Sequence, residues 1–238
     1  MTKQLYLKDT YLFELNALIA AKKQDDRGAY VLLDQTVFYP QGGGQPSDQG
    51  IMRNNILDLK ITSVRQIGNE IRHYLGSGIS EVLENQNVLC VIDKERRILN
   101  AKYHTAGHLL GNVTEVIYPS LKAIKGHSFP NEAYVEFQGD ELPDITKLQD
   151  SLDKAIAEGK RTIIFEMDPM SFEQKFYKLP YQIPDNKVFR IMQIEGFLPV
   201  PCGGTHLSRI SEIGSMTLEK IKVKNSIIRI SYEVHFSY

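Results

Sequence analysis

The chain has 238 residues, 42% of them hydrophobic and 24% charged, so it can bury a substantial core as one large domain or two small ones. Its formal net charge of −1 argues against a general nucleic-acid coat, although a local basic patch is compatible with that value. The two cysteines are too few for a disulfide framework, and no apolar run is long enough to span a bilayer. The first residues resemble neither a signal peptide nor a transit peptide. We therefore expect a cytoplasmic protein.

The first 88 residues are expected to be rich in β-strands. The segments YVLLDQTVFY (30–39) and LDLKITSVRQ (57–66) carry β-branched and aromatic residues in alternation or in apolar runs. Between them, FYPQGGGQPSDQG (38–50) contains too much glycine and proline for regular structure, and GSGIS (76–80) is expected to end the region.

Residues 89–238 mix strands and helices. NVLCVID (87–93) reads as a buried strand, with Cys90 in its core, and a helix is expected from about Lys94 to Ile117, where Pro119 stops it. Apolar residues at 145, 148, 152 and 156 predict a second, amphipathic helix. The segments YVEFQG, TIIFEM, VFRIMQIE, MTLEKIKV and IIRISYEV predict strands. Because there is no strict βαβ alternation, the pattern favours an α+β fold with a mostly antiparallel sheet.

Two short motifs contain residues that bind metals. In YHTAGHLLG, His104 and His108 are four residues apart, so a helix places both imidazoles on one face. In PCGGTHLS, Cys202 and His206 have the same spacing, and the two glycines allow the tight turn that lets them converge. Cysteine and histidine ligands suit zinc best, so we predict one zinc ion per chain.

Spacing alone leaves two roles open for this ion. Four protein ligands complete a tetrahedral shell, which is typical of a structural site, whereas catalysis needs an exchangeable position. The distance in sequence between the two ligand pairs favours catalysis, because a compact structural zinc module takes its ligands from one short segment. The sequence contains no HExxH, no Walker loop and no G-x-S-x-G elbow, and we expect no nucleotide cofactor.

The motifs HTAGHLL, PCGGTH and FYPQGGGQPSDQG together resemble the alanyl-tRNA editing family, whose free-standing AlaX members are homologous to the editing domain of alanyl-tRNA synthetase. The glycine-rich segment and the β-rich leader resemble the medium-length type. This resemblance implies an amino-terminal β-barrel over 1–88 and a zinc-binding α+β editing domain over 89–238. It also implies a deacylase that acts in trans and removes serine or glycine from mischarged alanine tRNA.

Further site residues are expected on this basis. A side chain that reads the serine hydroxyl is expected near the metal, with Thr36, Gln45 and His127 as candidates; each also has a plain structural interpretation. The backbone of Gly42, Gly43 and Gly44 is a candidate cradle for the terminal nucleotide or an oxyanion, or is simply a tight loop. For tRNA binding, the basic residues that we single out are Lys122, Lys125, Lys220, Lys222 and Lys224.

Several alternatives remain open from sequence. Asp93 and Arg97 match positions where the family often carries similar residues, and a helix-start role is the simpler account of Asp93. His73 and His235 match no motif and are expected to be structural. The rival functions are editing of another mischarged tRNA, of the threonine type, and a zinc-stabilised RNA-binding module without catalysis. The oligomeric state has no signal in the sequence.

Overall fold

The computed structural model describes residues 1–56, 58–77, 80, 82, 84–178 and 188–235. They divide into two compact units, Met1–Ala101 and Lys102–Tyr238, and the boundary falls inside helix α1 (Lys94–Ile117). Within the described ranges, no helix combines the length and the apolar character needed to cross a membrane.

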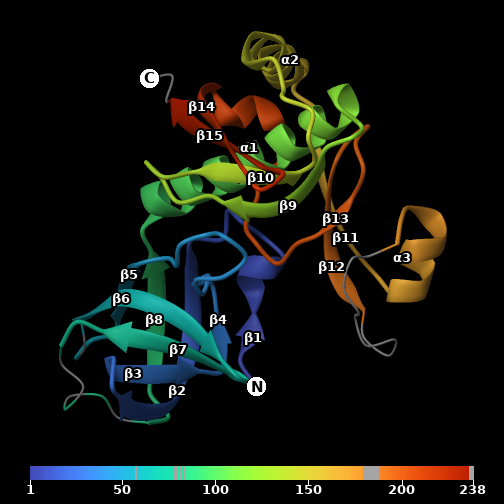
Figure 1. Cartoon of the computed structure of the whole chain (residues 1–238). Helices are drawn as coiled ribbons and strands as arrows, with labels where there is room; N and C mark the ends of the chain where they lie inside the picture. Colours follow the sequence, from blue (N-terminus) through green and yellow to red (C-terminus); the bar gives the residue numbers. More distant parts are fainter. Residues whose placement is uncertain (57, 78–79, 81, 83, 179–187, 236–238) are drawn as a thin grey trace. The chain divides into compact units, whose positions relative to one another are not determined.

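A closed β-barrel forms most of the first unit (Figure 1, blue to green). Its strands follow the order β2–β3–β7–β6–β5–β8, and each adjacent pair is antiparallel. Alternation along β6 turns Leu59 and Ile61 into the buried core of the barrel, and a register shift between Ile61 and Ser63 brings Val64 to the same side. The barrel implied by the family resemblance is therefore confirmed. Its strands are β2 (Glu14–Asp25), β3 (Gly28–Leu33), β5 (Gly50–Arg53), β6 (Asp58–Ile67), β7 (Glu70–Leu75) and β8 (Asn87–Ile92).

The barrel includes residues beyond the predicted limit at residue 88. Strand β8 pairs with both β2 and β5 and closes the barrel, and the first turns of α1 also belong to this unit. In the sequence, the stretch at 76–80 lies between β7 and β8. The short strands β1 (Lys3–Gln4) and β4 (Gln35–Thr36) form a parallel pair outside the barrel ring.

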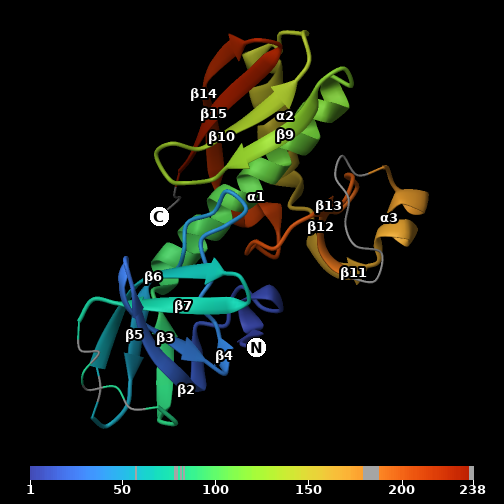
Figure 2. The same cartoon turned by 60° about the horizontal axis from the view of Figure 1, so that its bottom comes forward.

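The second unit is built on a four-stranded antiparallel sheet with the order β14–β15–β10–β9, and Figure 2 shows α1 and α2 (Ile145–Glu158) on one side of it. A smaller antiparallel sheet, β11–β12–β13, accompanies helix α3 (Pro169–Lys175). These two sheets confirm the predicted α+β class. The strands are β9 (Lys122–His127), β10 (Tyr134–Gln138), β11 (Thr162–Met167), β12 (Phe189–Ile194), β13 (Val200–Pro201), β14 (Ser215–Lys224) and β15 (Ile227–His235).

Both predicted long helices are present, and polar groups define their ends. The carboxylate of Asp93 accepts the backbone N–H of Arg96 at 3.0 Å, which caps the first turn of α1 and confirms the helix-start role. Asp144 caps α2 in the same way, and α2 ends at Gly159, whose φ of 63° is left-handed. The buried face of α2 contains Leu148 and Leu152, as the apolar spacing predicts.

Candidate metal centre

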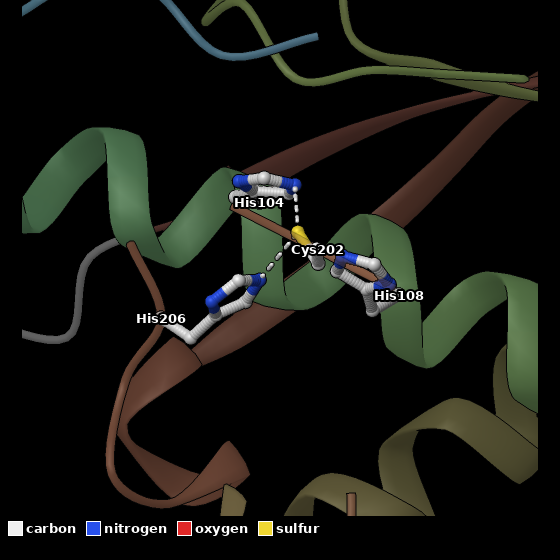
Figure 3. Close-up of side chains that lie close together, drawn as sticks. All are labelled: His104, His108, Cys202 and His206. Carbon is white, nitrogen blue, oxygen red and sulfur yellow. Dashed lines mark hydrogen bonds between the residues drawn. The ribbon is translucent and has the colours of Figure 1, made fainter. Parts of the chain in front are cut away.

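Four side chains from two segments of the second unit converge on one point (Figure 3). His104 and His108 lie one turn apart on α1, with ring centroids 5.0 Å apart and ring planes 20° from parallel. Cys202 and His206 come from the loop that follows β13, and the His206 ring centroid lies 4.6 Å from that of His104. The four ligand atoms all lie within 4.8 Å of one another.

The distances within this group fit a tetrahedral metal ion. The Cys202 Sγ atom lies 3.5 Å from His104 Nε2 and 3.4 Å from His206 Nε2. Zinc–sulfur and zinc–nitrogen bonds at a tetrahedral angle would separate such atoms by about 3.6 Å. Among the described residues, the buried Nε2 atom of His108 has no hydrogen-bond partner, which leaves a lone pair for a ligand. The group could therefore hold a metal ion, and its donor set suits zinc.

Burial keeps these side chains in forms that suit a cation. It lowers the pKa of His108 to about 4 and the pKa values of His104 and His206 well below the usual histidine value, and the positive charge of Arg190 adds to each effect. The imidazoles are therefore neutral, with lone pairs to donate. Burial also raises the pKa of the Cys202 thiol, and a bound dication would reverse this effect by favouring the thiolate.

Hydrogen bonds hold the Cys202–His206 loop against α1 and β12. The Thr105 hydroxyl accepts the backbone N–H of Leu207 at 3.1 Å. Arg190 forms two contacts with Cys202: its carbonyl accepts the Cys202 N–H at 3.0 Å, and its guanidinium donates to the Cys202 carbonyl at 2.6 Å. Sequence reasoning did not single out Thr105 or Arg190. The position of Thr105 within HTAGH was a usable signal, whereas Arg190 belongs to no motif.

Thr36 lies in the barrel unit and is fully buried there. Its hydroxyl lies 2.8 Å from His73 Nε2 and accepts the backbone N–H of Phe38 at 3.0 Å. His73 is also buried, with its Nδ1 atom 3.2 Å from the carbonyl of Val31. These contacts give both residues a structural role, and a substrate role for Thr36 stays a prediction.

The glycine-rich motif contains a tight turn of the barrel unit. Gly42 and Gln45 exchange two backbone hydrogen bonds of 3.2 and 2.9 Å. Gly43 and Gly44 adopt left-handed φ values of 52° and 77°, which explains why glycine occupies both positions. Gly42 and Gly43 are exposed at the tip, whereas Gln45 is buried at its base. Their predicted contact with a nucleotide remains untested.

His127 and the five predicted lysines lie on the four-stranded sheet of the second unit. His127 ends β9, where its ring stacks on Phe129 with centroids 4.4 Å apart and lies 3.6 Å from a carboxylate oxygen of Glu132. The lysines occupy the two outer strands: Lys122 and Lys125 on β9, and Lys220, Lys222 and Lys224 on β14.

Comparison with known proteins relates this chain to a family. The family model for tRNA synthetases class II (A) matches residues 8–96. An alanine–tRNA ligase of Ignicoccus hospitalis is 28% identical over 97% of this chain and 26% of its own length. The alanyl-tRNA editing protein AlaX-L of Pyrococcus horikoshii is 31% identical over 98% of this chain and 58% of its own length. This chain thus spans only part of each of these two relatives.

A third relative matches over almost its whole length. The alanyl-tRNA editing protein AlaX-M of Methanosarcina acetivorans is 30% identical to this chain over 98% of both sequences. A second AlaX-M protein, from Methanosarcina barkeri, is also 30% identical with the same coverage. The chain therefore belongs to the family of alanyl-tRNA editing proteins.

Proposed function

We propose that this protein is a zinc-dependent aminoacyl-tRNA hydrolase that acts in trans and removes wrongly attached serine or glycine from alanine tRNA. The observation that carries the proposal is the convergence of His104, His108, Cys202 and His206 in a member of the alanyl-tRNA editing family. Action in trans is proposed because the AlaX-M relatives are named as editing proteins and not as ligases. Because the substrate is a charged tRNA, we expect the protein to act in the cytoplasm.

The chemistry of amino-acid selection explains why such a hydrolase is needed. An activation pocket that accepts alanine cannot strongly reject glycine, which lacks one methyl, or serine, which adds a hydroxyl; such differences are worth only about 1–3 kcal/mol. A separate editing site with polar groups for the serine hydroxyl can exclude alanine, because those groups would lose their partners when alanine is bound.

The reaction is hydrolysis of the ester between the amino acid and the terminal adenosine of the tRNA. Bound zinc would supply Lewis-acid chemistry, either by making a water molecule more acidic or by holding the aminoacyl group in place. His108 and Cys202 are the two partly exposed members of the group, so we propose that the ester approaches from their side. The N–H groups of Gly42, Gly43 and Gly44 are proposed to bind the terminal nucleotide or the oxyanion. Thr36, Gln45 and His127 are the proposed readers of the serine hydroxyl.

The proposal is tested by metal analysis combined with a deacylation panel. Wild type, His104→Ala and Cys202→Ala are compared on serine- and glycine-charged alanine tRNA, alanine-charged alanine tRNA and serine-charged threonine tRNA. We expect about one zinc per wild-type chain, hydrolysis of the first two substrates, and loss of zinc and activity in both variants. His235→Ala is the matched control, because His235 is an exposed histidine outside the ligand group.

Two outcomes would contradict the proposal in different ways. Preference for serine-charged threonine tRNA would identify an editor of the threonine type. Zinc-loaded wild type without turnover on any mischarged tRNA would leave a zinc-stabilised RNA-binding module, in which Cys202→Ala lowers the melting temperature and the metal content but removes no activity.

A further inference from the structure

We infer that one face of the β14–β15–β10–β9 sheet is a docking surface for the sugar–phosphate backbone of double-stranded RNA. The inference deepens the proposed function and rests on it for the identity of the RNA. It starts from the strand register, which brings six cationic residues from three strands onto the same face. The surface is called the basic face below, and its cations are Lys122, Lys125, Lys220, Lys222, Lys224 and Arg229.

The register assigns these residues to one side of the sheet. Residues directly opposite each other on paired strands point to the same face. Lys222 pairs with Arg229, Arg229 pairs with Glu136, and Glu136 pairs with Lys125, so all four residues share a side. On β14, Lys220 and Lys224 are two residues from Lys222 and therefore point the same way.

The opposite face of the sheet is occupied by the helical layer. Tyr232, Ile228 and Ile230 alternate with Arg229 and are buried. The hydroxyl of Tyr232 donates to the carbonyl of Tyr103 on α1, which places α1 on that side. The sheet therefore has one apolar face packed on a helix and one polar face, where the five lysines are exposed.

The charge of the basic face differs from that of the whole chain. The strand pairings place six cations and two acidic residues, Glu136 and Glu233, on this face, and the exposed bulge residue Glu219 adds a third acid beside Lys220. The cations still outnumber the acids two to one, although the chain as a whole has a net charge of −1. Glu136 is engaged by Arg229, whose Nε donates to it at 2.9 Å. On the edge strand, the Lys122 side chain is 64% exposed and its ammonium group lies 3.9 Å from the carboxylate of Glu115. Such an exposed ion pair contributes little to stability in water, so it does not hold Lys122 away from a ligand. This charge complements a polyanion.

The aromatic residues on this face favour backbone contacts over base stacking. Tyr134 lies on β10, between β9 and β15. From the β9 side the His127 ring stacks against it, with centroids 5.2 Å apart, and from the β15 side the Arg229 guanidinium lies 3.9 Å from its ring centre. Neighbours already occupy the ring of Tyr134, so it offers no open platform for a base of a single strand.

The spacing of the lysines also suits a phosphate backbone. Alternate residues on a strand are about 6.7 Å apart, so Lys220, Lys222 and Lys224 form a straight row about 13 Å long. A row of regularly spaced ammonium groups matches the repeating phosphates of a nucleic-acid strand and carries no information about base sequence. We therefore expect binding that depends strongly on salt and weakly on sequence.

The test is the salt dependence of binding to uncharged alanine tRNA, measured by fluorescence anisotropy of a labelled transcript. The variant carries Lys220→Gln, Lys222→Gln and Lys224→Gln, and the control carries Lys147→Gln, Lys154→Gln and Lys175→Gln, which are exposed lysines of α2 and α3 with the same charge change. Each lost phosphate contact should reduce the slope of log Kd against log salt by about 1. We expect a slope lower by about 3 and a Kd raised at least about tenfold at low salt, with little change in the control.

Three results would overturn the inference: no measurable binding by wild type, equal losses of affinity in variant and control, or tighter binding of a single-stranded RNA than of a duplex of the same sequence.

Deacylation kinetics distinguish failure of the docking surface from failure of the proposed function. If the basic face binds substrate, the triple variant raises KM for mischarged tRNA and leaves kcat unchanged. If wild type binds the tRNA through the basic face but hydrolyses no mischarged tRNA, the docking surface stands and the proposed function falls.

Discussion

Thr105 is a candidate for a residue that positions a metal ligand without binding the metal itself. It lies between the two histidines of α1, is fully buried, and accepts the N–H of Leu207, the residue after His206. Thr105→Val removes this acceptor, so the ligand loop should lose its attachment to α1. We expect zinc affinity, measured by competition with a chelator, to fall about tenfold, in the range typical for groups that orient ligands.

Thr114→Val is the matched control for this experiment. Thr114 is equally buried on α1, and its hydroxyl has no hydrogen-bond partner among the described residues. Thr105→Ser keeps the acceptor and should retain most of the affinity. Equal zinc affinities for Thr105→Val and Thr114→Val would show that the Leu207 contact does not position the loop.

His73 makes the stability of the barrel depend on pH. Burial lowers its pKa from 6.5 to about 4, so between these values the unfolded chain binds a proton that the folded barrel excludes. The stability that neutral His73 contributes is therefore complete above pH 6.5 and is lost as the pH falls towards 4, by up to about 3 kcal/mol. The free energy of unfolding of His73→Gln, measured by urea titration with circular dichroism, should decline less over this range than that of wild type. Parallel curves for the two proteins would contradict this account.

At the scale of elements, the packing of α1 against β15 depends on one glycine. A Cβ atom at Gly107 would lie 2.7 Å from the Tyr232 hydroxyl and 3.3 Å from Ser128 Oγ. Gly107→Ala should therefore lower the free energy of unfolding by about 1–3 kcal/mol, although alanine is the better helix former. Gly111→Ala on the same helix is the control, because its Cβ would meet only Ala123 Cβ at 3.6 Å, and it should be neutral or stabilising by up to about 1 kcal/mol. The melting temperatures of both variants are measured by thermal denaturation. Equal shifts in melting temperature for Gly107→Ala and Gly111→Ala would exclude a role for the close contact at Gly107.

A buried ion pair joins the glycine-rich segment to the start of α1. Arg97 and Asp48 are fully buried, Arg97 Nε lies 3.1 Å from the carboxylate of Asp48, and that carboxylate also accepts the N–H of Tyr39 at 2.6 Å. Arg97→Met leaves an unpaired buried charge and should lower the free energy of unfolding by about 3–5 kcal/mol. Adding Asp48→Asn removes that charge and keeps an acceptor for Tyr39, so the double variant should recover part of the loss.

An exposed ion pair provides the comparison. Arg161 and Glu195 lie 3.5 Å apart with side chains 62% and 48% exposed, and breaking this pair should change the free energy of unfolding by less than about 1 kcal/mol. Urea denaturation of wild type, Arg97→Met, Asp48→Asn and the double variant gives the coupling energy of the buried pair, and the same four-protein cycle is measured for Arg161 and Glu195. If the coupling energy of Arg97 and Asp48 is as small as that of the exposed pair, the buried ion pair does not hold the glycine-rich segment to the start of α1.

For the whole molecule, local signals predicted the elements better than they predicted their partners. The two ends of α1 followed from Asp93 and Pro119, α2 followed from its apolar spacing, and the segment MTLEKIKV predicted the strand β14. Strand β9 was not predicted, because every residue from Lys122 to Gly126 is exposed and shows no alternation of apolar and polar positions.

Pairings between residues far apart in the chain could not be predicted from the sequence. The contact between Thr36 and His73, and the closure of the barrel by β8, depend on register between strands far apart in the chain. The ligand group was an exception, because two identical four-residue spacings in residues that favour one metal indicate a shared site without any knowledge of register. Arg190 had no such signal, since a single arginine in a strand is common.

The two units should respond differently when metal is removed. Both ligand pairs belong to Lys102–Tyr238, so zinc at a hundred times its Kd would stabilise this unit by about 2.7 kcal/mol and contribute no ligand contacts within the barrel. In hydrogen-exchange mass spectrometry, a chelator should increase exchange around His104, His108 and the Cys202–Leu207 loop, while exchange in the barrel strand β3 stays unchanged. Added zinc should restore the protection and added magnesium should not, because magnesium prefers oxygen ligands. Equal loss of protection in β3 would contradict a metal site confined to the second unit.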